Sequence, residues 1–169
     1  ADWVDKHPRA AQALLMAVME AQMWCEAPAN KAEMAEIIGK RQWFNVPVAD
    51  IIGRISGEIN YGLGRKASDA ALAMRFWKNG ASYPFKSHDT WFVTENIRWG
   101  KFEPTIDIKA LVDKTNRSDL WQAAAKQLGV AGYPTGDSRG VETFFDGVKF
   151  DPANPMAYLN TLKIKRAVG

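Results

Sequence analysis

Apolar residues recur along much of the chain with the spacing of an α-helix, and this periodicity predicts most of its secondary structure. Leu14, Val18, Ala21 and Cys25 fall at positions i, i+4, i+7 and i+11. This spacing predicts a helix over 8–25 with one stripe that faces a core. Proline at position 8 suits the first helical turn, where a backbone N–H has no helical partner in any case.

The same reasoning predicts further helices, each bounded by a capping residue, a proline or a glycine. They cover about residues 30–39, 47–55, 68–77, 87–98, 107–114, 118–128 and 156–162. Ser87 or Asp89 is expected to cap the helix that runs to Arg98, because short polar side chains accept hydrogen bonds from free N–H groups at a helix start.

Three segments with turn-forming residues interrupt the helical pattern. Residues 57–65 carry three glycines, which predict a loop. Residues 83–85 are predicted to form an extended connector, and residues 132–140 are predicted to form an ordered surface loop. Short strands are predicted at 141–145 and 147–150. The chain is therefore expected to be predominantly α with a few short strands.

Composition narrows the class of protein. The 169 residues suit one domain or a large piece of a bigger one, and 47% hydrophobic with 24% charged residues is typical of a globular fold. The net charge of +3 comes from 22 basic and 19 acidic residues spread along the chain, which argues against a nucleic-acid binder. No apolar run reaches the roughly 18 residues that a membrane span needs. The first residue is Ala rather than Met and no signal peptide precedes the first helix, so we expect a processed or excised product.

Two polar clusters are candidates for binding chemistry. In the first, Lys86 and His88 would contact an anion at a helix start, with Asp89 orienting the imidazole. The alternative is that the cluster only caps the helix. In the second, Arg139 would bind an anion with two parallel hydrogen bonds, or take part in a local turn with an ion pair.

The sequence gives little indication of a catalytic site or a metal site. The two histidines and the single Cys25 lie far apart and show no zinc spacing. They do not form a nucleophile–base–orienter set either. Cys25 lies in an apolar stretch, where a buried and inert thiol is expected. We expect no enzyme activity, no cofactor and no bound metal.

Several long motifs resemble one known family. They are Ala1–Lys6, Ala13–Cys25, Gly39–Pro47, Phe76–Gly80, Lys86–Phe92, Thr94–Gly100 and Asp137–Gly147. Together they are similar to the C-terminal portion of the nitrate- and bicarbonate-binding proteins of ABC importers. The resemblance covers nearly the whole chain.

The resemblance implies a fold and a function. It implies the C-terminal part of a two-lobed α/β periplasmic binding protein of type II, with residues 1–169 lacking the N-terminal lobe and most of the anion's ligands. The family's ligand-associated lysine would lie upstream of Ala1, so Lys86, His88 and Arg139 remain the candidates within the chain. Nitrate, nitrite or bicarbonate would be delivered to an ABC permease and its ATPase, from the periplasm or a lipid anchor on the outer face of the cytoplasmic membrane. The alternative is an anion sensor fused to the ATPase subunit, which would be cytoplasmic.

Overall fold

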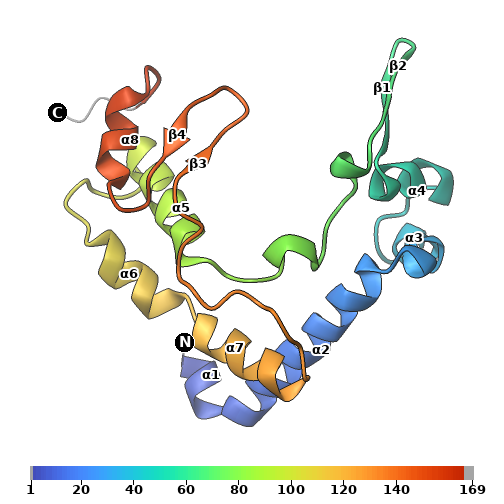
Figure 1. Cartoon of the computed structure of the whole chain (residues 1–169), viewed down its shortest axis with the longest axis horizontal. Coiled ribbons are helices and arrows are strands. Elements are labelled where there is room, and N and C mark those ends of the chain that lie inside the picture. The colour runs from blue at the N-terminus through green and yellow to red at the C-terminus, as the bar shows by residue number, and fades with distance from the viewer. Residues whose placement is uncertain (1, 166–169) are drawn as a thin grey trace. The chain divides into compact units, whose positions relative to one another are not determined.

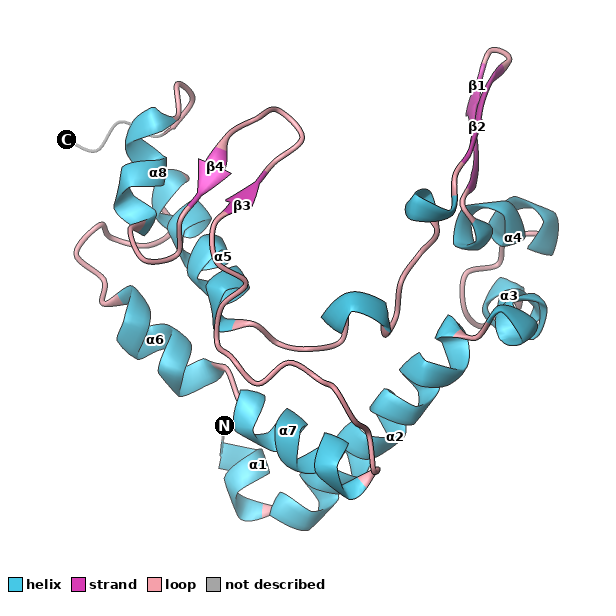
Figure 2. Ribbon diagram, viewed as in Figure 1, coloured by secondary structure: helices cyan, strands magenta, loops and turns pink. Residues whose placement is uncertain are grey.

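A computed structural model describes residues 2–165 of the chain, and helices dominate it (Figures 1 and 2). The helices are α1 (Asp2–Lys6), α2 (Pro8–Glu26), α3 (Lys31–Gly39), α4 (Val48–Ser56), α5 (Lys86–Arg98), α6 (Ile108–Thr115), α7 (Ser118–Gln127) and α8 (Pro155–Thr161). The short strands β1 (Glu58–Gly62) and β2 (Arg65–Ser68) form one antiparallel hairpin, and β3 (Glu142–Thr143) and β4 (Lys149–Phe150) form another. The predicted helix-rich class is confirmed.

The chain divides into two compact units. The first unit comprises Ala1–Gln12 and Tyr83–Gly169, and the second comprises Ala13–Ser82. Residues 1 and 166–169 of the predicted 1–169 domain lie outside the described part of the chain.

The core of the second unit forms where α3 packs against α4. Its buried residues are Met34, Ala35, Ile51 and Ile55, and Cys25, Ile38, Ile52 and Phe76 pack against them. Both helices contribute residues spaced three or four apart, as the sequence pattern predicts. The predicted helices over 30–39 and 47–55 are therefore confirmed with small shifts at their ends.

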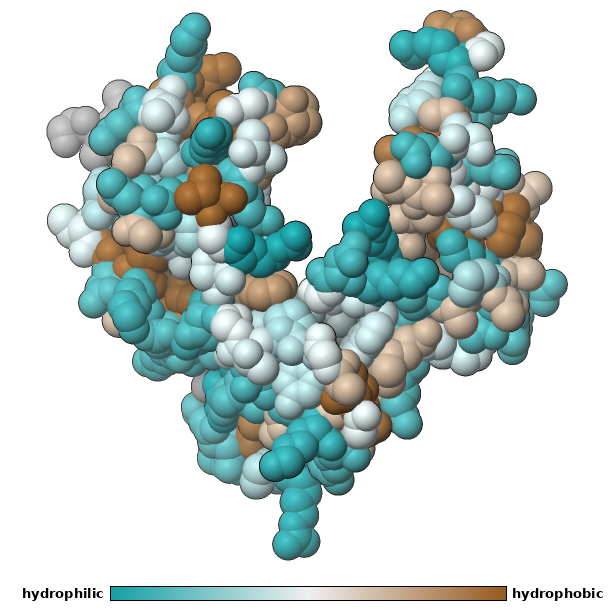
Figure 3. All heavy atoms as spheres, viewed as in Figure 1, coloured by the Kyte–Doolittle hydropathy of each residue, from teal (hydrophilic) through white to brown (hydrophobic). Residues whose placement is uncertain are grey.

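The predicted loop over 57–65 is wrong, because β1 and β2 pair there with Glu58 opposite Ser68. Leu63 and Gly64 both have positive φ, +50° and +76°, which suits the tight turn of a hairpin. The strands are almost entirely exposed and show no apolar alternation, so the sequence carries no strand signal. The hairpin tip shows a hydrophobic patch in the space-filling view (Figure 3).

The predicted helix over 68–77 is also wrong, since only one 3₁₀ turn forms, at Ala70–Leu72. Asp69 does cap this turn, with its carboxylate accepting the N–H of Ala71 at 2.8 Å. The chain beyond the turn is held instead by Glu26, whose carboxylate accepts the N–H groups of Phe76 at 2.7 Å and Trp77 at 2.9 Å. A contact across 50 residues thus overrides the local helical pattern.

The core of the first unit surrounds α5, which packs against α6 and α8. One cluster of its buried residues comprises Ile97, Phe150, Tyr158 and Leu159. The β3–β4 ladder pairs Glu142 with Phe150 and is shorter than the strands predicted at 141–145 and 147–150. Within residues 2–165, no helix is long and apolar enough to cross a membrane.

Candidate functional site

The first turn of α5 begins one residue earlier than predicted, and neither Ser87 nor Asp89 caps it. Phe85 occupies the N-cap position in an extended conformation and makes no side-chain cap. The N–H of Ser87 donates to the carbonyl of Asp137 at 3.1 Å, and Asp89 accepts from the side-chain amide of Asn116 at 2.6 Å. A backbone carbonyl from the segment that follows α7 replaces the expected side-chain cap. It accepts one of the N–H groups that have no partner within the first turn of the helix.

The same segment brings the three predicted binding residues together. The hydroxyl of Ser87 accepts the backbone N–H of Arg139 at 3.3 Å, so the loop around Arg139 lies against the turn that carries Lys86 and His88. Ser87 is buried, with 4% of its surface exposed. Residues about 50 positions apart therefore share one site on the first unit.

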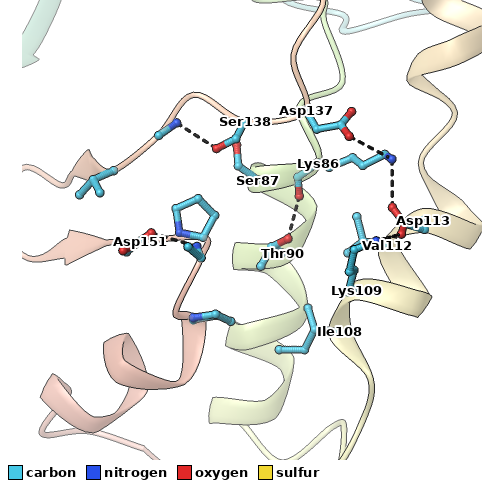
Figure 4. Close-up of a pocket in the computed structure, with 15 residues that line it drawn as sticks. Lys86, Ser87, Thr90, Ile108, Lys109, Val112, Asp113, Asp137, Ser138 and Asp151 are labelled. Atoms are coloured by element: carbon cyan, nitrogen blue, oxygen red, sulfur yellow. Dashed lines mark hydrogen bonds and ion pairs between the residues drawn. The ribbon is translucent and has the colours of Figure 1, made fainter.

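Lys86 lies between two carboxylates (Figure 4). Its Nζ is 2.9 Å from Oδ1 of Asp113 on α6 and 3.3 Å from Oδ2 of Asp137. The hydrogen bond to Asp113 raises the pKa of Lys86 above its ordinary value, against an opposing effect of burial. Lys109 also donates to Asp113, and the hydrogen bonds from Lys109 and then Lys86 lower the pKa of the Asp113 carboxyl. The ammonium is thus held charged between two carboxylates.

Glu142 on β3 pairs with the other two candidate residues, His88 and Arg139. One of its carboxylate oxygens is 3.1 Å from Nε2 of His88, and the other is 3.5 Å from Nε of Arg139. The guanidinium of Arg139 also lies over the ring of Phe85, 5.7 Å from its centroid, a favourable cation–π position. The predicted orienting partner of His88, Asp89, contacts Asn116 instead.

Each of the three candidate side chains is therefore paired with a carboxylate within the described chain. An anion that approached Lys86, His88 or Arg139 would have to displace Asp113, Asp137 or Glu142, or accept their repulsion. The arrangement instead links the loop after α7 to α5 and α6 through ion pairs. Sequence reasoning missed Asp113 and Glu142, because no spacing in the sequence indicates which carboxylate reaches a given cation.

A groove adjoins these ion pairs. It has a volume of about 660 Å³ and lies between α5, α6, the loop 137–141 and the segment 151–155 (Figure 4). Its lining combines apolar side chains with the charged groups around Lys86. The apolar residues are Ile108, Val112, Val141, Pro152, Ala153 and Pro155, and the charged ones are Lys86, Lys109, Asp113, Asp137 and Asp151. The three carboxylates outnumber the two ammonium groups, so the groove does not favour an anion.

The part of the chain that the structure covers shows no cluster of metal ligands and no activated thiol. Among residues 2–165, no group of three or more His, Cys, Asp and Glu side chains is arranged to hold a metal ion. Cys25 is half-buried, and burial raises the pKa of its thiol. A raised thiol pKa lowers the fraction of nucleophilic thiolate at neutral pH.

Comparison with known proteins gives matches over nearly the whole chain. Residues 1–39 match a model of the NMT1-like family. The chain is 56% identical over 168 residues to the nitrate/nitrite binding protein NrtA of a Synechocystis strain, and 50% identical over 177 residues to the bicarbonate-binding protein CmpA of Synechococcus elongatus. These alignments cover 98% and 99% of the chain but only 38% and 39% of the two relatives.

A more distant relative and a solved structure complete the comparison. The nitrate import ATP-binding protein NrtC of Synechococcus elongatus is 29% identical over 98% of the chain and 24% of its own length. The crystal structure of the periplasmic nitrate-binding protein NrtA from Synechocystis superposes with a TM-score of 0.94, at 56% identity, over 97% of the chain and 43% of that structure. The chain thus spans less than half the length of the binding proteins that it matches.

Proposed function

Because this chain belongs to the family of nitrate- and bicarbonate-binding proteins of ABC importers, we propose that it is part of the substrate-binding component of such an importer. Its ligand would be nitrate or a related small anion, nitrite or bicarbonate. The observation that carries the proposal is the agreement of sequence and shape with NrtA, 56% identity and a TM-score of 0.94 over 97% of the chain. A likeness of this extent is far beyond a shared fold alone.

Within the receptor, residues 1–169 form the C-terminal portion of the solute-binding domain, and the N-terminal lobe is contributed by the rest of the polypeptide. Two lobes that close on a small anion surround it with N–H and cationic donors and exclude water. Lys86, His88 and Arg139 already have carboxylate partners. We therefore assign the anion's main ligands to the rest of the receptor, and these three residues to holding the loop after α7 in place.

The receptor has no catalytic role in this proposal. It acts in the periplasm, free or through a lipid anchor on the outer face of the cytoplasmic membrane, and delivers its anion to a permease driven by an ATPase. No nucleic acid takes part. Binding energy alone accounts for this activity, because a receptor only has to capture its ligand and release it.

An anion sensor fused to the transporter ATPase is the second candidate. It is favoured by the match to NrtC, which also covers 98% of the chain. The identity of 29% to NrtC is about half of the 56% to NrtA, so the receptor is the better supported function. An ATPase domain in the same polypeptide would favour the sensor function over the receptor function.

The proposal is tested by isothermal titration calorimetry of the full-length protein with nitrate, nitrite and bicarbonate. We expect saturable heat with at least one of the three anions, and displacement when a second anion competes for the same site. Chloride serves as the control anion, since it has the same charge and no oxygen acceptors. Absence of heat with all three oxyanions would refute the receptor function.

A further inference from the structure

A small polar pocket lies in the second unit, where Glu26 holds the segment that follows the 3₁₀ turn. Its volume is about 240 Å³, and its lining comes from the end of α2, the start of α3, the end of α4 and the segment 70–79. The lining residues with charged or polar side chains are Glu26, Lys31, Ser56, Arg75, Lys78 and Asn79. All of them belong to Ala13–Ser82, so the pocket is contained in one compact unit.

Three cations line this pocket beside a single carboxylate, and that carboxylate already has backbone partners. Glu26 accepts the N–H groups of Phe76 at 2.7 Å and Trp77 at 2.9 Å. The guanidinium of Arg75 makes no hydrogen bond or ion pair with any of residues 2–165. Within the same range, the ammonium of Lys78 makes no hydrogen bond and interacts with Glu26 through its charge alone. Three positive charges and one negative charge leave the lining with an excess of two positive charges.

The third cation, Lys31, is held at the pocket by one hydrogen bond. Its ammonium donates to the carbonyl of Ile55 at 2.8 Å. This bond covers an acceptor at the C-terminal end of α4 that would otherwise repel an anion. An ammonium has three N–H donors, so two of them remain for a ligand. Because Lys31 is partly buried, solvent and salt screen its attraction to an anion less than that of a fully exposed lysine.

We propose that this pocket binds a doubly charged tetrahedral oxyanion of the phosphate class. The excess of two positive charges matches a dianion, whereas nitrate and bicarbonate carry one negative charge each. The guanidinium of Arg75 can donate two parallel hydrogen bonds to two oxygens of a phosphate, and lysine binds phosphate as a point charge. Free inorganic phosphate and an organic phosphomonoester share this chemistry. The pocket is independent of the proposed receptor function, because it lies outside the Lys86, His88 and Arg139 site and does not need the transported anion.

Isothermal titration calorimetry of the full-length protein with inorganic phosphate, at about pH 8 where the dianion dominates, tests the proposal. We expect saturable heat, and the double variant R75Q/K78Q should weaken binding at least about tenfold, because it removes the two cations that have no hydrogen-bond partner. The matched control R65Q/K66Q removes the same two charges from exposed positions on the β1–β2 hairpin of the same unit. It should change the affinity by no more than about twofold. Thermal melting checks that both variants are folded.

Competition identifies the class and the source of the ligand. Sulfate, which has the same charge and shape, should displace phosphate, and nitrate at the same concentration should not. Glycerol 3-phosphate separates the two sources: tighter binding than inorganic phosphate identifies an organic phosphomonoester, and equal or weaker binding identifies free phosphate.

Three results would overturn the proposal. They are the absence of saturable heat with both phosphates up to about 10 mM, an equal loss of affinity in the two double variants, and displacement of phosphate by nitrate. The receptor function is tested separately by nitrate titration of R75Q/K78Q, which should bind nitrate as the unaltered protein does. Phosphate binding without nitrate binding refutes the receptor alone, and nitrate binding without phosphate binding refutes the pocket alone.

Discussion

The ammonium of Lys86 on α5 lies 2.9 Å from the carboxylate of Asp113 on α6, and this ion pair joins two helices through residues that are 27 positions apart in the sequence. Asp137, from the loop after α7, reaches the same ammonium at 3.3 Å. A single cation thus connects three segments of the first unit. This relationship identifies Lys86 as a positioning residue for the loop 137–142 and leads to the first prediction.

Replacing Lys86 with Met removes the charge but keeps most of the side chain's apolar bulk. We expect the melting temperature to fall by a few degrees, because Asp113 and Asp137 lose a shared partner. Lys109→Met is the matched control: Lys109 pairs with the same carboxylate, but its side chain is 87% exposed against 26% for Lys86. Differential scanning fluorimetry should show the smaller loss for K109M, and an equal loss would contradict the positioning role.

The pH dependence of the Lys86 effect follows from the pKa shifts. The lowered pKa of Asp113 means that its contribution is complete above its unfolded pKa of about 3.9 and is lost as pH falls through the folded value. The raised pKa of Lys86 means that its contribution is complete below about 10.4 and is lost as pH rises through the folded value. Urea denaturation should therefore show a constant difference between wild type and K86M from about pH 5 to 9, which shrinks on either side.

In the receptor that we propose, His88→Gln and Arg139→Gln should leave the anion affinity of the full-length protein unchanged within about twofold, because both side chains are already paired with Glu142. Stability should fall slightly as the loop after α7 is loosened. Calorimetric titration with nitrate measures the affinity, and thermal melting measures the stability. A tenfold loss of affinity in either variant at unchanged stability would show a direct ligand role.

Tyr158 links the core of the first unit to a polar network. Its hydroxyl donates to Oε1 of Glu95 at 2.8 Å and accepts from the indole N–H of Trp91 at 3.3 Å. Tyr158→Phe leaves both partners without this contact, and we expect a loss of about 1–2 kcal/mol in the free energy of unfolding. Tyr61→Phe, on the hairpin where the ring is 57% exposed, is the control and should change nothing measurable by urea denaturation.

Gly57 ends α4 with φ of +88°, and a Cβ at this position would lie 2.3 Å from the carbonyl oxygen of Asp69. Gly57→Ala should therefore destabilise the second unit by about 2 kcal/mol or more, through backbone strain together with the clash. Gly129→Ala is the matched control, because Gly129 has φ of +69° but no neighbour within 4 Å. It should show only the cost of the left-handed conformation, about 1 kcal/mol, in the same denaturation experiment. Equal losses would mean that the contact with Asp69 adds nothing.

Most of the helices and the resemblance to the family could be predicted from the sequence itself. The spacing of Ile51 and Ile55 predicts an amphipathic helix because neighbours three and four positions apart share a face wherever the helix lies. The resemblance to the family was equally visible, since motifs such as Lys86–Phe92 are contiguous and need no fold to be recognised. Both kinds of information are local in the chain.

The tertiary structure decided the elements and pairings that depend on distant residues. Glu26 holds the N–H groups of Phe76 and Trp77 and keeps that segment from continuing as a helix. Asp137 takes the place of the expected cap at the start of α5. The sequence indicated Lys86, His88 and Arg139 as candidates, but only the fold placed a carboxylate beside each, because the energy of a charge interaction depends on distance in space and not on separation along the chain.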